Sequence, residues 1–285
     1  MLPRYLETPY GPRSGRVLRD VVVGCFLATT IVFVDSLPAC AETRLTAHYA
    51  ISIAGVGIGE GTWKVEIDKT RYSTRADGAF TGIWRLLAGG DVYSQTRGSV
   101  IRSGLAPTQY EANFALDEAI DEVRMELRDG AVTRLDVTPP LPEVADRVPM
   151  TEAHRRGVVD PLTAGLVPAP AAGDILAPAA CERTLAMFDG GHRFDMALAF
   201  KRMDAAKTEP GYGGPVVVCG MTYRPISGHS PTGWRVKHLI GREGMEMWFA
   251  PLGGARLLAM YRISIPTMVG TAVLSATRFE AAAGR

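Results

Sequence analysis

Two cysteines carry the clearest chemical signal in the sequence. Cys181 and Cys219 are the two of the four cysteines that lie beyond residue 41. An even pair in an exported chain favours a disulfide, because oxidising compartments let disulfides persist. Closing that loop would stabilise the fold by roughly 3 to 4 kcal/mol on the chain-entropy model. Two buried free thiols and a two-ligand metal site are the alternatives, although no CxxC spacing or nearby histidine pair supports a metal.

Two groups of polar residues could be imagined as active sites. Asp189, His192 and Asp195 surround one predicted turn, where two carboxylates and an imidazole are more often solvated than metal-bound. Ser230 directly follows His229, but a catalytic triad requires convergence in space, which a dipeptide does not supply. The sequence contains no GxSxG, HExxH or paired-carboxylate motif. We therefore assign no catalytic residue, no metal site and no cofactor.

Two further patterns suggest ligand contacts and have simpler explanations. The glycines from Gly55 to Gly61 lack the last glycine of a dinucleotide fingerprint, and no helical pattern follows them. Alternate glycines instead clear one face of a strand, which suits a sharply bent sheet or close approach by another chain. A modest basic cluster could contact a lipid headgroup or glycan phosphate, or form a solvated basic face. Its members are Arg235, Lys237, His238 and Arg242.

The first 41 residues resemble a secretory signal peptide. A basic lead precedes the apolar run Val21–Val34 and the small residues Ala39-Cys40-Ala41, so cleavage is expected after Ala41. The apolar run is shorter than the ~20 residues that a membrane-spanning helix needs. Lipid attachment at Cys40 is the alternative, which would tether the protein to a membrane. We expect a periplasmic protein with no transmembrane span after signal removal.

The remaining 285 − 41 = 244 residues are electrically balanced. The lead holds four of the 31 Lys/Arg and three of the 30 Asp/Glu residues, which leaves 27 basic and 27 acidic residues. A net charge of zero gives no electrostatic reason to expect nucleic acid or an anionic membrane surface as a partner. This length suffices for one large β domain or two small ones. We expect one domain, residues 42–285.

Alternating apolar and polar residues after Leu45 predict about a dozen strands. The clearest alternation runs from Phe194 to Phe200, and the preceding Asp189–His192 turn predicts a hairpin. A capping residue and first-turn proline at Asp160-Pro161 predict a short helix within the Pro/Ala-rich segment 139–180, which is expected to cross the surface. The segment 234–239 is interpreted as a strand. The predicted fold is all-β, a large antiparallel curved sheet or open β-barrel with one or two short helices.

The apolar faces of these strands are the candidate ligand site. If the sheet closes tightly they fill a core, and if it stays open they line a groove for a lipid tail, where methionines suit a variable ligand. The stretch 81–90 is expected to be a loop or single turn that plugs the core or gates the mouth. The candidate ligand-lining residues are Trp84, Leu86, Phe194, Met196, Leu198, Phe200, Met247 and Phe249.

Several sequence phrases resemble exported bacterial proteins of domain-of-unknown-function family 3108. They are GIWRLLAGG, DPLTAGL, CERTLAMFDGGHRFD, CGMTYRPISGH and IPTMVGTAVLSATRF, together with Tyr49 and Gly55-x-x-x-Gly59. The resemblance covers nearly all of the chain after residue 41, and the paired cysteines flanking the FDG hairpin fit it. It implies a periplasmic β-rich protein and supplies no catalytic residues. A similarity of shape alone links the expected sheet to lipoprotein-carrier half-barrels, which hold acyl chains on a concave face.

Three functional hypotheses follow from this interpretation. The first is a non-enzymatic periplasmic envelope protein that binds a hydrophobic ligand, a lipid or lipoprotein, on a concave sheet. The second is a structural or scaffolding protein of the envelope that binds a protein partner. The third is an uncharacterised hydrolase, which would require polar residues converging in a buried cleft.

Overall fold

The structure is a computed structural model that describes residues 43–88, 90–116 and 119–283. The expected signal peptide, its cleavage position at Ala41 and the alternative lipid site at Cys40 lie outside the described residues. The strands are β1 Thr43–Ile53, β2 Val56–Ile67, β3 Arg71–Phe80, β4 Asp91–Ile101, β5 Gly104–Leu116, β6 Ala119–Arg128, β7 Ala131–Thr138, β8 Leu166–Pro168, β9 Arg183–Phe188, β10 Arg193–Ala205, β11 Pro215–Ser227, β12 Glu246–Leu252, β13 Leu257–Thr267 and β14 Gly270–Ala283. The helices are α1 Ile83–Ala88, α2 Pro161–Ala164 and α3 Trp234–Leu239, with two 3₁₀ turns at Glu152–Arg155 and Pro178–Ala180.

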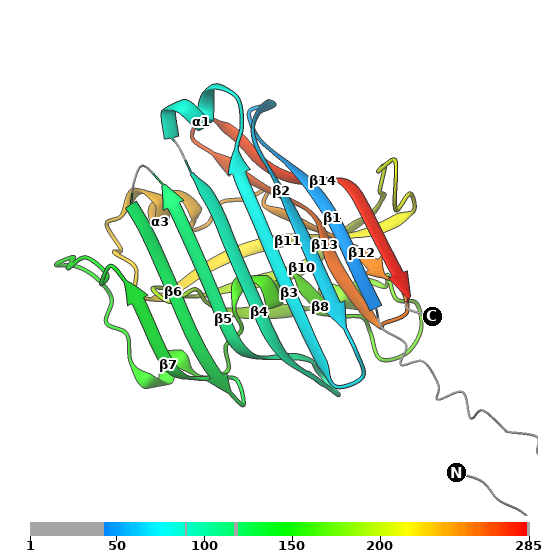
Figure 1. The fold of residues 1–285 in the computed structure, drawn as a ribbon, viewed down its shortest axis with the longest axis horizontal. Helices are drawn as coiled ribbons and strands as arrows, with labels where there is room; N and C mark the ends of the chain where they lie inside the picture. Colours follow the sequence, from blue (N-terminus) through cyan, green and yellow to red (C-terminus); the bar gives the residue numbers. More distant parts are fainter. Residues whose placement is uncertain (1–42, 89, 117–118, 284–285) are drawn as a thin grey trace, which may run out of the picture. The chain divides into compact units, whose positions relative to one another are not determined.

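All these strands belong to one antiparallel sheet (Figure 1). Its order is β7-β6-β5-β4-β3-β2-β1-β14-β13-β12-β11-β10-β9, and the short β8 pairs with β13 beside this path. Each hairpin places neighbouring strands side by side, and the last strand returns to the first, with Ala283 opposite Thr43. The predicted all-β fold is confirmed, since the sheet curves strongly but its two edge strands do not pair with each other.

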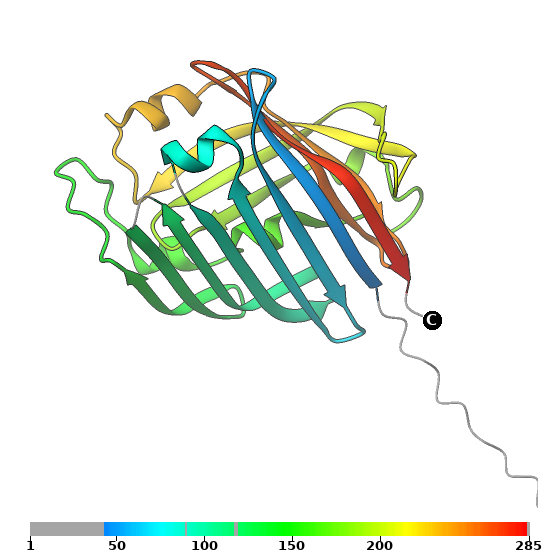
Figure 2. The same ribbon diagram turned by 45° about the horizontal axis from the view of Figure 1, so that its top comes forward.

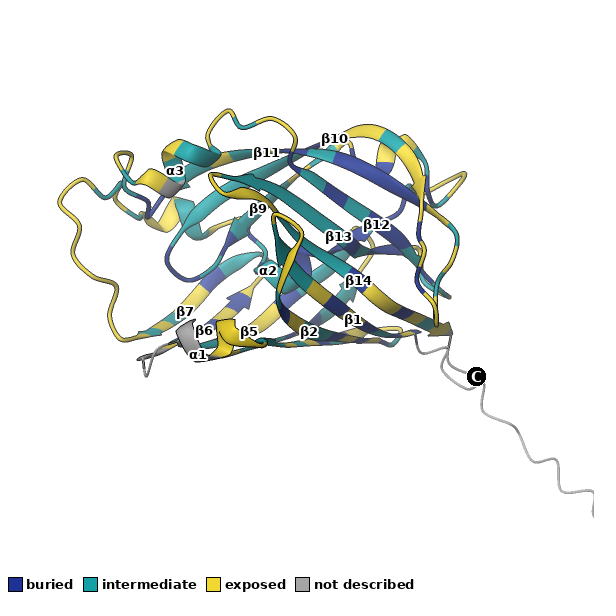
Figure 3. Ribbon diagram, turned by 90° about the horizontal axis from the view of Figure 1, so that it is seen from above, coloured by how far each residue is buried: buried dark blue, intermediate teal, exposed yellow. Residues whose placement is uncertain are grey.

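The sheet edges β7 and β9 are joined through the segment that precedes α2. Viewed from above, β5–β7 and β9–β11 form opposite walls of the curved sheet (Figure 3). Arg156 bridges Ala131 in β7, and Val159 bridges Met187 in β9. The Val159 N–H donates to the Ala186 carbonyl at 2.9 Å. Residues 156–159 thereby bind one end of each edge strand, where they occupy backbone groups that would otherwise invite pairing with another chain.

The core follows the alternation of the strands. In β2, Trp63, Val65 and Ile67 are buried, while Lys64 and Glu66 between them are exposed. Since side chains alternate across a strand, this pattern assigns one face of β2 to the interior and the other to solvent. The buried residues form three clusters, of which the largest joins β1–β3 to β13 and β14.

The predicted disulfide is confirmed. Cys181 and Cys219 are bonded, with their Cα atoms 5.4 Å apart, and they enclose a separation of 38 residues. Both are fully buried among the apolar residues of the second cluster, beside Leu198 and Met247. The alternatives of free thiols and of a two-ligand metal site are thereby excluded for this pair.

The segment 234–239 is a helix, so its interpretation as a strand was wrong. The Lys237 N–H donates to the Gly233 carbonyl and the Ile240 N–H to the Val236 carbonyl, which is helical bonding. The sequence WRVKHL is too short for the spacing of its apolar residues to distinguish the period of two of a strand from the period of 3.6 of a helix. Tertiary packing decides between them, because the helix places Leu239 against the second core cluster.

Only the middle of the Pro/Ala-rich segment leaves the surface, since residues 139–146 and 171–174 are exposed. Val158, Asp160, Ala164 and Leu166 are all at most 4% exposed, and α2 lies within the curve of the sheet (Figure 3). The predicted short helix at 161–164 is present, with Asp160 as its N-cap and Pro161 in its first turn. Proline prevents this segment from joining a continuous ladder, but it does not prevent a capped turn from filling the interior.

Candidate functional site

An apolar cavity of about 390 Å³ lies inside the curve of the sheet. Its lining comes from β1–β4, α2, β9 and β12–β14. Apart from backbone atoms, the lining is apolar except for Thr62 and Asp77. The lining residues are Tyr49, Ile51, Gly61, Thr62, Trp63, Ala76, Asp77, Gly78, Ala79, Phe80, Gly90, Val92, Pro161, Leu162, Ala164, Gly165, Met187, Met247, Met260, Ile263 and Leu274. We call this space the interior cavity.

Glycines that lie opposite each other in adjacent strands create the space of the interior cavity. Tyr49 in β1 lies opposite Gly61 in β2, which lies opposite Gly78 in β3, which lies opposite Val92 in β4. Two neighbouring positions of this row therefore have no side chain. Ala76, two residues before Gly78 on the same face, extends the small surface. The volume that larger residues would fill remains empty.

The glycines of β2 also allow a close approach of β3. A Cβ atom at Gly59 would lie 2.7 Å from the Ala79 carbonyl oxygen, and one at Gly61 would lie 2.9 Å from the Asp77 oxygen. Both distances are too short for any other residue without a shift of the backbone. The alternate glycines thus serve the curvature of this wall. Gly78 differs, since its Cβ would meet only the Glu60 oxygen at 3.5 Å.

The short helix α2 forms the floor of the interior cavity. Leu162, Ala164 and Gly165 contribute to the lining, and a Cβ atom at Gly165 would lie 3.2 Å from the Trp63 ring. The Met260 N–H donates to the Gly165 carbonyl at 2.9 Å, which ties the end of α2 to β13. The floor is therefore fixed to the walls by both side-chain packing and backbone hydrogen bonding.

A buried carboxylate anchors this floor. Asp160 is 0% exposed, and its Oδ1 accepts hydrogen bonds from Thr96 Oγ1 (2.7 Å) and from the Leu162 and Thr163 amides (3.0 Å each). Its Oδ2 accepts from Thr163 Oγ1 at 2.6 Å, and that hydroxyl also contacts Tyr72 Oη at 2.7 Å. Burial raises the pKa of the Asp160 carboxyl, while the hydrogen bonds from Thr163 and Thr96 act to lower it. Both oxygens are engaged in holding α2, so this group has a structural role.

Methionines supply an adaptable part of the cavity wall. Met187, Met247 and Met260 come from β9, β12 and β13 and all line the interior cavity. Tyr49 also lines the cavity, and its hydroxyl could contact a polar ligand. That hydroxyl already donates to the Met260 carbonyl at 2.6 Å. Burial raises the pKa of Tyr49, so the ring stays neutral. Unbranched thioether side chains adjust to ligands of different shape, whereas the surrounding ring and aliphatic groups are fixed.

The predicted ligand-lining residues are distributed over several environments. Met247 lines the interior cavity. Leu198 and Phe249 are buried in the second core cluster, with Met196 packed against it, and the Phe194 ring contacts the tilted Tyr223 ring with centroids 5.5 Å apart. Phe200 is 40% exposed and Trp84 is 38% exposed. The side chain of Leu86 lies outside the described part of the structure.

Most of the cavity lining comes from strands that the sequence-based prediction did not select. β1–β4 contribute over half of it, chiefly through small residues and their large neighbours. The available signal was the pair Ala76 and Gly78, which interrupts an otherwise bulky inward face of β3 after Tyr72 and Thr74. Small residues at inward positions of adjacent strands indicate a cavity, but only the strand register shows that they are adjacent.

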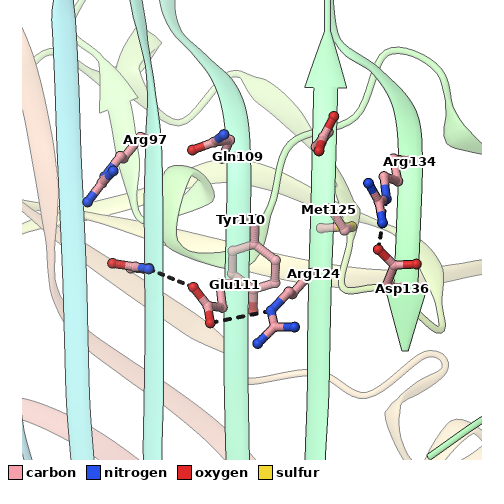
Figure 4. A pocket seen from close by; sticks show the side chains of 10 residues that line it. Arg97, Gln109, Tyr110, Glu111, Arg124, Met125, Arg134 and Asp136 are labelled. Atoms are coloured by element: carbon pink, nitrogen blue, oxygen red, sulfur yellow. Dashed lines mark hydrogen bonds and ion pairs between the residues drawn. The ribbon is translucent and has the colours of Figure 1, made fainter. Parts of the chain in front are cut away.

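A second concavity lies on the solvent face of β4–β7 (Figure 4). Its volume is about 340 Å³, and its lining includes three arginines, two glutamates and one aspartate. Glu111 accepts from Gln95 at 2.7 Å and lies 3.6 Å from Arg124, and Arg134 pairs with Asp136 at 2.9 Å. These opposite charges compensate one another, so the surface selects neither an anion nor a cation, and we assign it no ligand.

The polar groups considered as active sites do not converge. The Ser230 hydroxyl donates to Asp146 at 2.7 Å and lies 3.1 Å from the Thr232 hydroxyl, so it is engaged away from the His229 ring. Asp189 accepts from the amides of Gly191 and His192 and lies 3.3 Å from His192 Nδ1, but Asp195 does not join them, because it pairs with Arg193 at 2.6 Å. Within 43–283, apart from the gaps named above, no cluster of His, Cys, Asp and Glu has the composition of a metal site.

Over the same residues, no helix is both long and apolar enough to span a bilayer.

The chain matches a family model over most of its length. Residues 46–277 match the model described as "Protein of unknown function (DUF3108)". A search of curated proteins found no match. Among solved structures, the chain is similar to the beta-barrel-like protein of domain of unknown function DUF1849 from Brucella abortus. That similarity has 11% identity and a TM-score of 0.48, and it covers 85% of this chain and 98% of the other.

Proposed function

We propose that this chain, which belongs to the DUF3108 family of proteins of unknown function, binds the hydrocarbon part of a lipid or lipoprotein in the interior cavity and catalyses no reaction. The observation that carries the proposal is the cavity itself. It is lined by apolar side chains from nine elements of the fold, and its volume of about 390 Å³ falls within the ~300–1,000 Å³ range of small-molecule sites.

The composition of the cavity favours a flexible hydrocarbon chain over a polar ligand. A polar ligand would lose its hydration and find few partners, because the Tyr49 hydroxyl is already bonded to Met260. A hydrocarbon chain instead gains ~0.8 kcal/mol for each methylene that it buries. The three methionines of the wall suit a ligand whose chain length and unsaturation vary.

We also propose that the protein acts in the periplasm after export. The signal-like residues 1–41 support this location, and so does the Cys181–Cys219 disulfide, because cytosolic thiols are kept reduced. In that compartment lipids and lipoproteins must cross an aqueous space, where an apolar cavity keeps a hydrocarbon chain out of water.

The expected result of expressing the full chain with export intact is a protein that begins at Glu42. Signal peptidase cleaves after small residues such as those at Ala39-Cys40-Ala41. N-terminal sequencing and intact mass of the periplasmic fraction measure this directly. A mature protein that begins at an acylated Cys40 would show a lipid-anchored protein instead, and retention of residues 1–41 in the cytosol would contradict export.

Filling the cavity is expected to weaken ligand binding without harming the fold. In Gly78→Val, the added carbons occupy room for about three methylenes, so affinity for a fatty-acid probe should fall about fiftyfold. The Gly78 backbone is not left-handed and its Cβ position is free of clashes, so stability should be unchanged or slightly higher. Displacement of a fluorescent fatty acid gives the affinity, and thermal unfolding gives the stability.

Gly220→Val is the matched control for this measurement. Gly220 lies in β11 on the face opposite Cys219, does not line the interior cavity, and its Cβ would meet only the Ala199 oxygen at 3.9 Å. This variant should bind the probe as the original protein does. Equal binding by Gly78→Val and Gly220→Val would place the ligand elsewhere, and absence of binding to the unaltered protein would refute the proposed function.

A further inference from the structure

We propose that the mouth of the interior cavity docks on the surface of a lipid bilayer that contains anionic lipids. Four segments at one end of the sheet form this rim: the β1–β2 turn, α1, α3 with the turn after it, and the β13–β14 turn. All four lie at the same end of the strands in Figures 1 and 2. The inference builds on the proposed lipid-binding role of the cavity, and its test is separable from that role.

The rim segments are neighbours in the structure. The Ala54 N–H of the β1–β2 turn donates to the Thr271 carbonyl at 3.0 Å, next to the β13–β14 turn. His238 Nε2 of α3 lies 3.1 Å from the Pro266 carbonyl oxygen near the end of β13. The Thr81 N–H, just before α1, donates to the Ile58 carbonyl of β2 at 3.0 Å. The four segments therefore form one continuous border.

This border opens onto the cavity. Phe80 and Gly90 flank α1 on either side and both line the interior cavity. Ile51 lines it as well, two residues before the end of β1. On its inner side the cavity is bounded by α2, which the hydrogen bonds of Asp160 and the Met260–Gly165 hydrogen bond hold in place. A hydrocarbon chain would accordingly enter and leave past the rim.

Large apolar side chains project from the rim into solvent. They account for most of the strongly exposed large apolar residues of the described chain, and two of the four tryptophans are among them. Those more than half exposed are Val56 at 56%, Ile83 at 64%, Trp234 at 62%, Ile240 at 52%, Met268 at 71% and Val269 at 71%, and Trp84 is 38% exposed. Exposed apolar residues gathered in this way mark an interaction surface.

The charge of the rim identifies the kind of surface. The rim segments 54–56, 82–88, 234–244 and 267–270 contain Arg85, Arg235, Lys237 and Arg242 against one acidic residue, Glu243. Arg85 also lies 3.8 Å from Asp91 at the start of β4, so four positive charges against two negative give the rim a net charge of +2, although the chain after residue 41 is neutral overall. Basic residues near an anionic bilayer are attracted by about 1 kcal/mol each.

The combination of residue types favours a bilayer over a folded protein partner. Tryptophan beside aliphatic and basic residues is the composition of membrane-interface segments, where rings lie at headgroup level and cations meet lipid phosphates. The exposed side chains come from separate short turns and helices that surround an opening. A bilayer accepts such scattered insertions, and it also supplies the hydrocarbon chain that the cavity is proposed to hold.

The test is binding of the mature protein to vesicles. Vesicles of phosphatidylethanolamine and phosphatidylglycerol should bind the protein, those of phosphatidylcholine alone should bind it more weakly, and added salt should reduce the difference. Emission of Trp84 and Trp234 should shift to shorter wavelength and be quenched by brominated lipids, and Trp84→Phe/Trp234→Phe should remove this signal. Trp63, which is 4% exposed, should not respond.

Rim variants and a matched control locate the contact. Met268→Ser/Val269→Ser should lower the vesicle partition coefficient about tenfold, and Lys237→Glu, which changes the charge by two units, should lower it about thirtyfold for the anionic vesicles only. Ile101→Ser/Met203→Ser removes two exposed apolar side chains, 47% and 44% exposed, away from the rim and should have no effect. Failure of the unaltered protein to bind either vesicle, or equal loss in rim and control variants, would overturn the proposal.

The same assay separates this inference from the proposed function. Gly78→Val should bind vesicles normally while losing the fatty-acid probe, because its change is inside the cavity. Vesicle binding without any probe binding would refute the cavity's proposed role and leave docking intact. Binding of an acylated peptide that depends on the rim, without vesicle binding, would show a lipoprotein partner and contradict bilayer docking.

Discussion

Replacing Cys181 and Cys219 by alanine is expected to lower the free energy of unfolding by about 4 kcal/mol. The disulfide encloses 38 residues, and a loop of that length restricts the unfolded chain by about this amount on the chain-entropy model. The loss is large compared with the ~5–15 kcal/mol that stabilises a typical domain. Urea unfolding of the mature protein, followed by far-ultraviolet circular dichroism, measures it.

The disulfide variant should also affect the interior cavity. Cys219 lies directly opposite Met247, and Met247 lines the cavity. Without the bond the segment containing Cys181 is no longer tied to this wall, so probe affinity should fall as well. Reduction of the unaltered protein with a thiol reagent should reproduce both effects. An alanine double variant with an unchanged urea midpoint would show that packing alone holds the two segments together.

Replacing Asp160 by alanine is expected to cost about 3 kcal/mol of stability. The substitution removes an N-cap, which contributes about 1 kcal/mol, and leaves the buried hydroxyls of Thr96 and Thr163 without their acceptor, at about 1 kcal/mol or more each. Since α2 is the cavity floor, probe binding should weaken in the same variant. Chemical unfolding and probe displacement give the two quantities.

Asp160→Asn provides the conservative comparison for that variant. The amide oxygen can still accept from Thr96 and from the first-turn amides, so most of the stability should return. Asp146→Ala is the matched control, because Asp146 also accepts from hydroxyls, those of Ser230 and Thr232, but at exposed positions. It should cost far less, since water replaces a lost partner at the surface. Equal effects at Asp160 and Asp146 would contradict the structural role of the buried carboxylate.

The stability difference between the unaltered protein and Asp160→Asn should depend on pH. Burial raises the pKa of Asp160 in the folded state above its unfolded value of about 3.9. Between these two pKa values the folded protein holds a proton that the unfolded chain has lost, so stability from this group is greatest at acid pH and decreases as pH rises. The stability advantage of the aspartate over the asparagine variant should therefore shrink from about pH 4 upward, until pH exceeds the raised pKa. Urea unfolding of both proteins across this pH range measures the difference, and a difference that grows with pH would contradict the raised pKa.

The proton can be accommodated without breaking the floor of the cavity. When Oδ2 of Asp160 is protonated it donates to the Thr163 hydroxyl, which can then donate to Tyr72 Oη at 2.7 Å. The remaining oxygen, Oδ1, keeps its three donors. The same side chains thus satisfy both protonation states, which is why a fully buried carboxyl is tolerated here.

Local patterns in the sequence were sufficient to predict the all-β fold, the disulfide and the α2 cap, but not the helix at 234–239. Period-two alternation at Phe194–Phe200, turn residues at Asp189–His192 and the Asp160-Pro161 start each depend on residues close in the chain. The family resemblance drew on the same local phrases. The cysteine pair needed only their number and the expected compartment.

The interior cavity and the rim depend on contacts between residues far apart in the chain. Tyr49, Gly61, Gly78 and Val92 become one row only through the register of four strands, and α2 becomes a floor only because the sheet curves around it. A one-residue change of register would reverse every side chain of a strand between interior and solvent. Strand composition therefore predicted an all-β fold, whereas three-dimensional packing determined which apolar residues fill the core, which line a hollow and which remain exposed at its mouth.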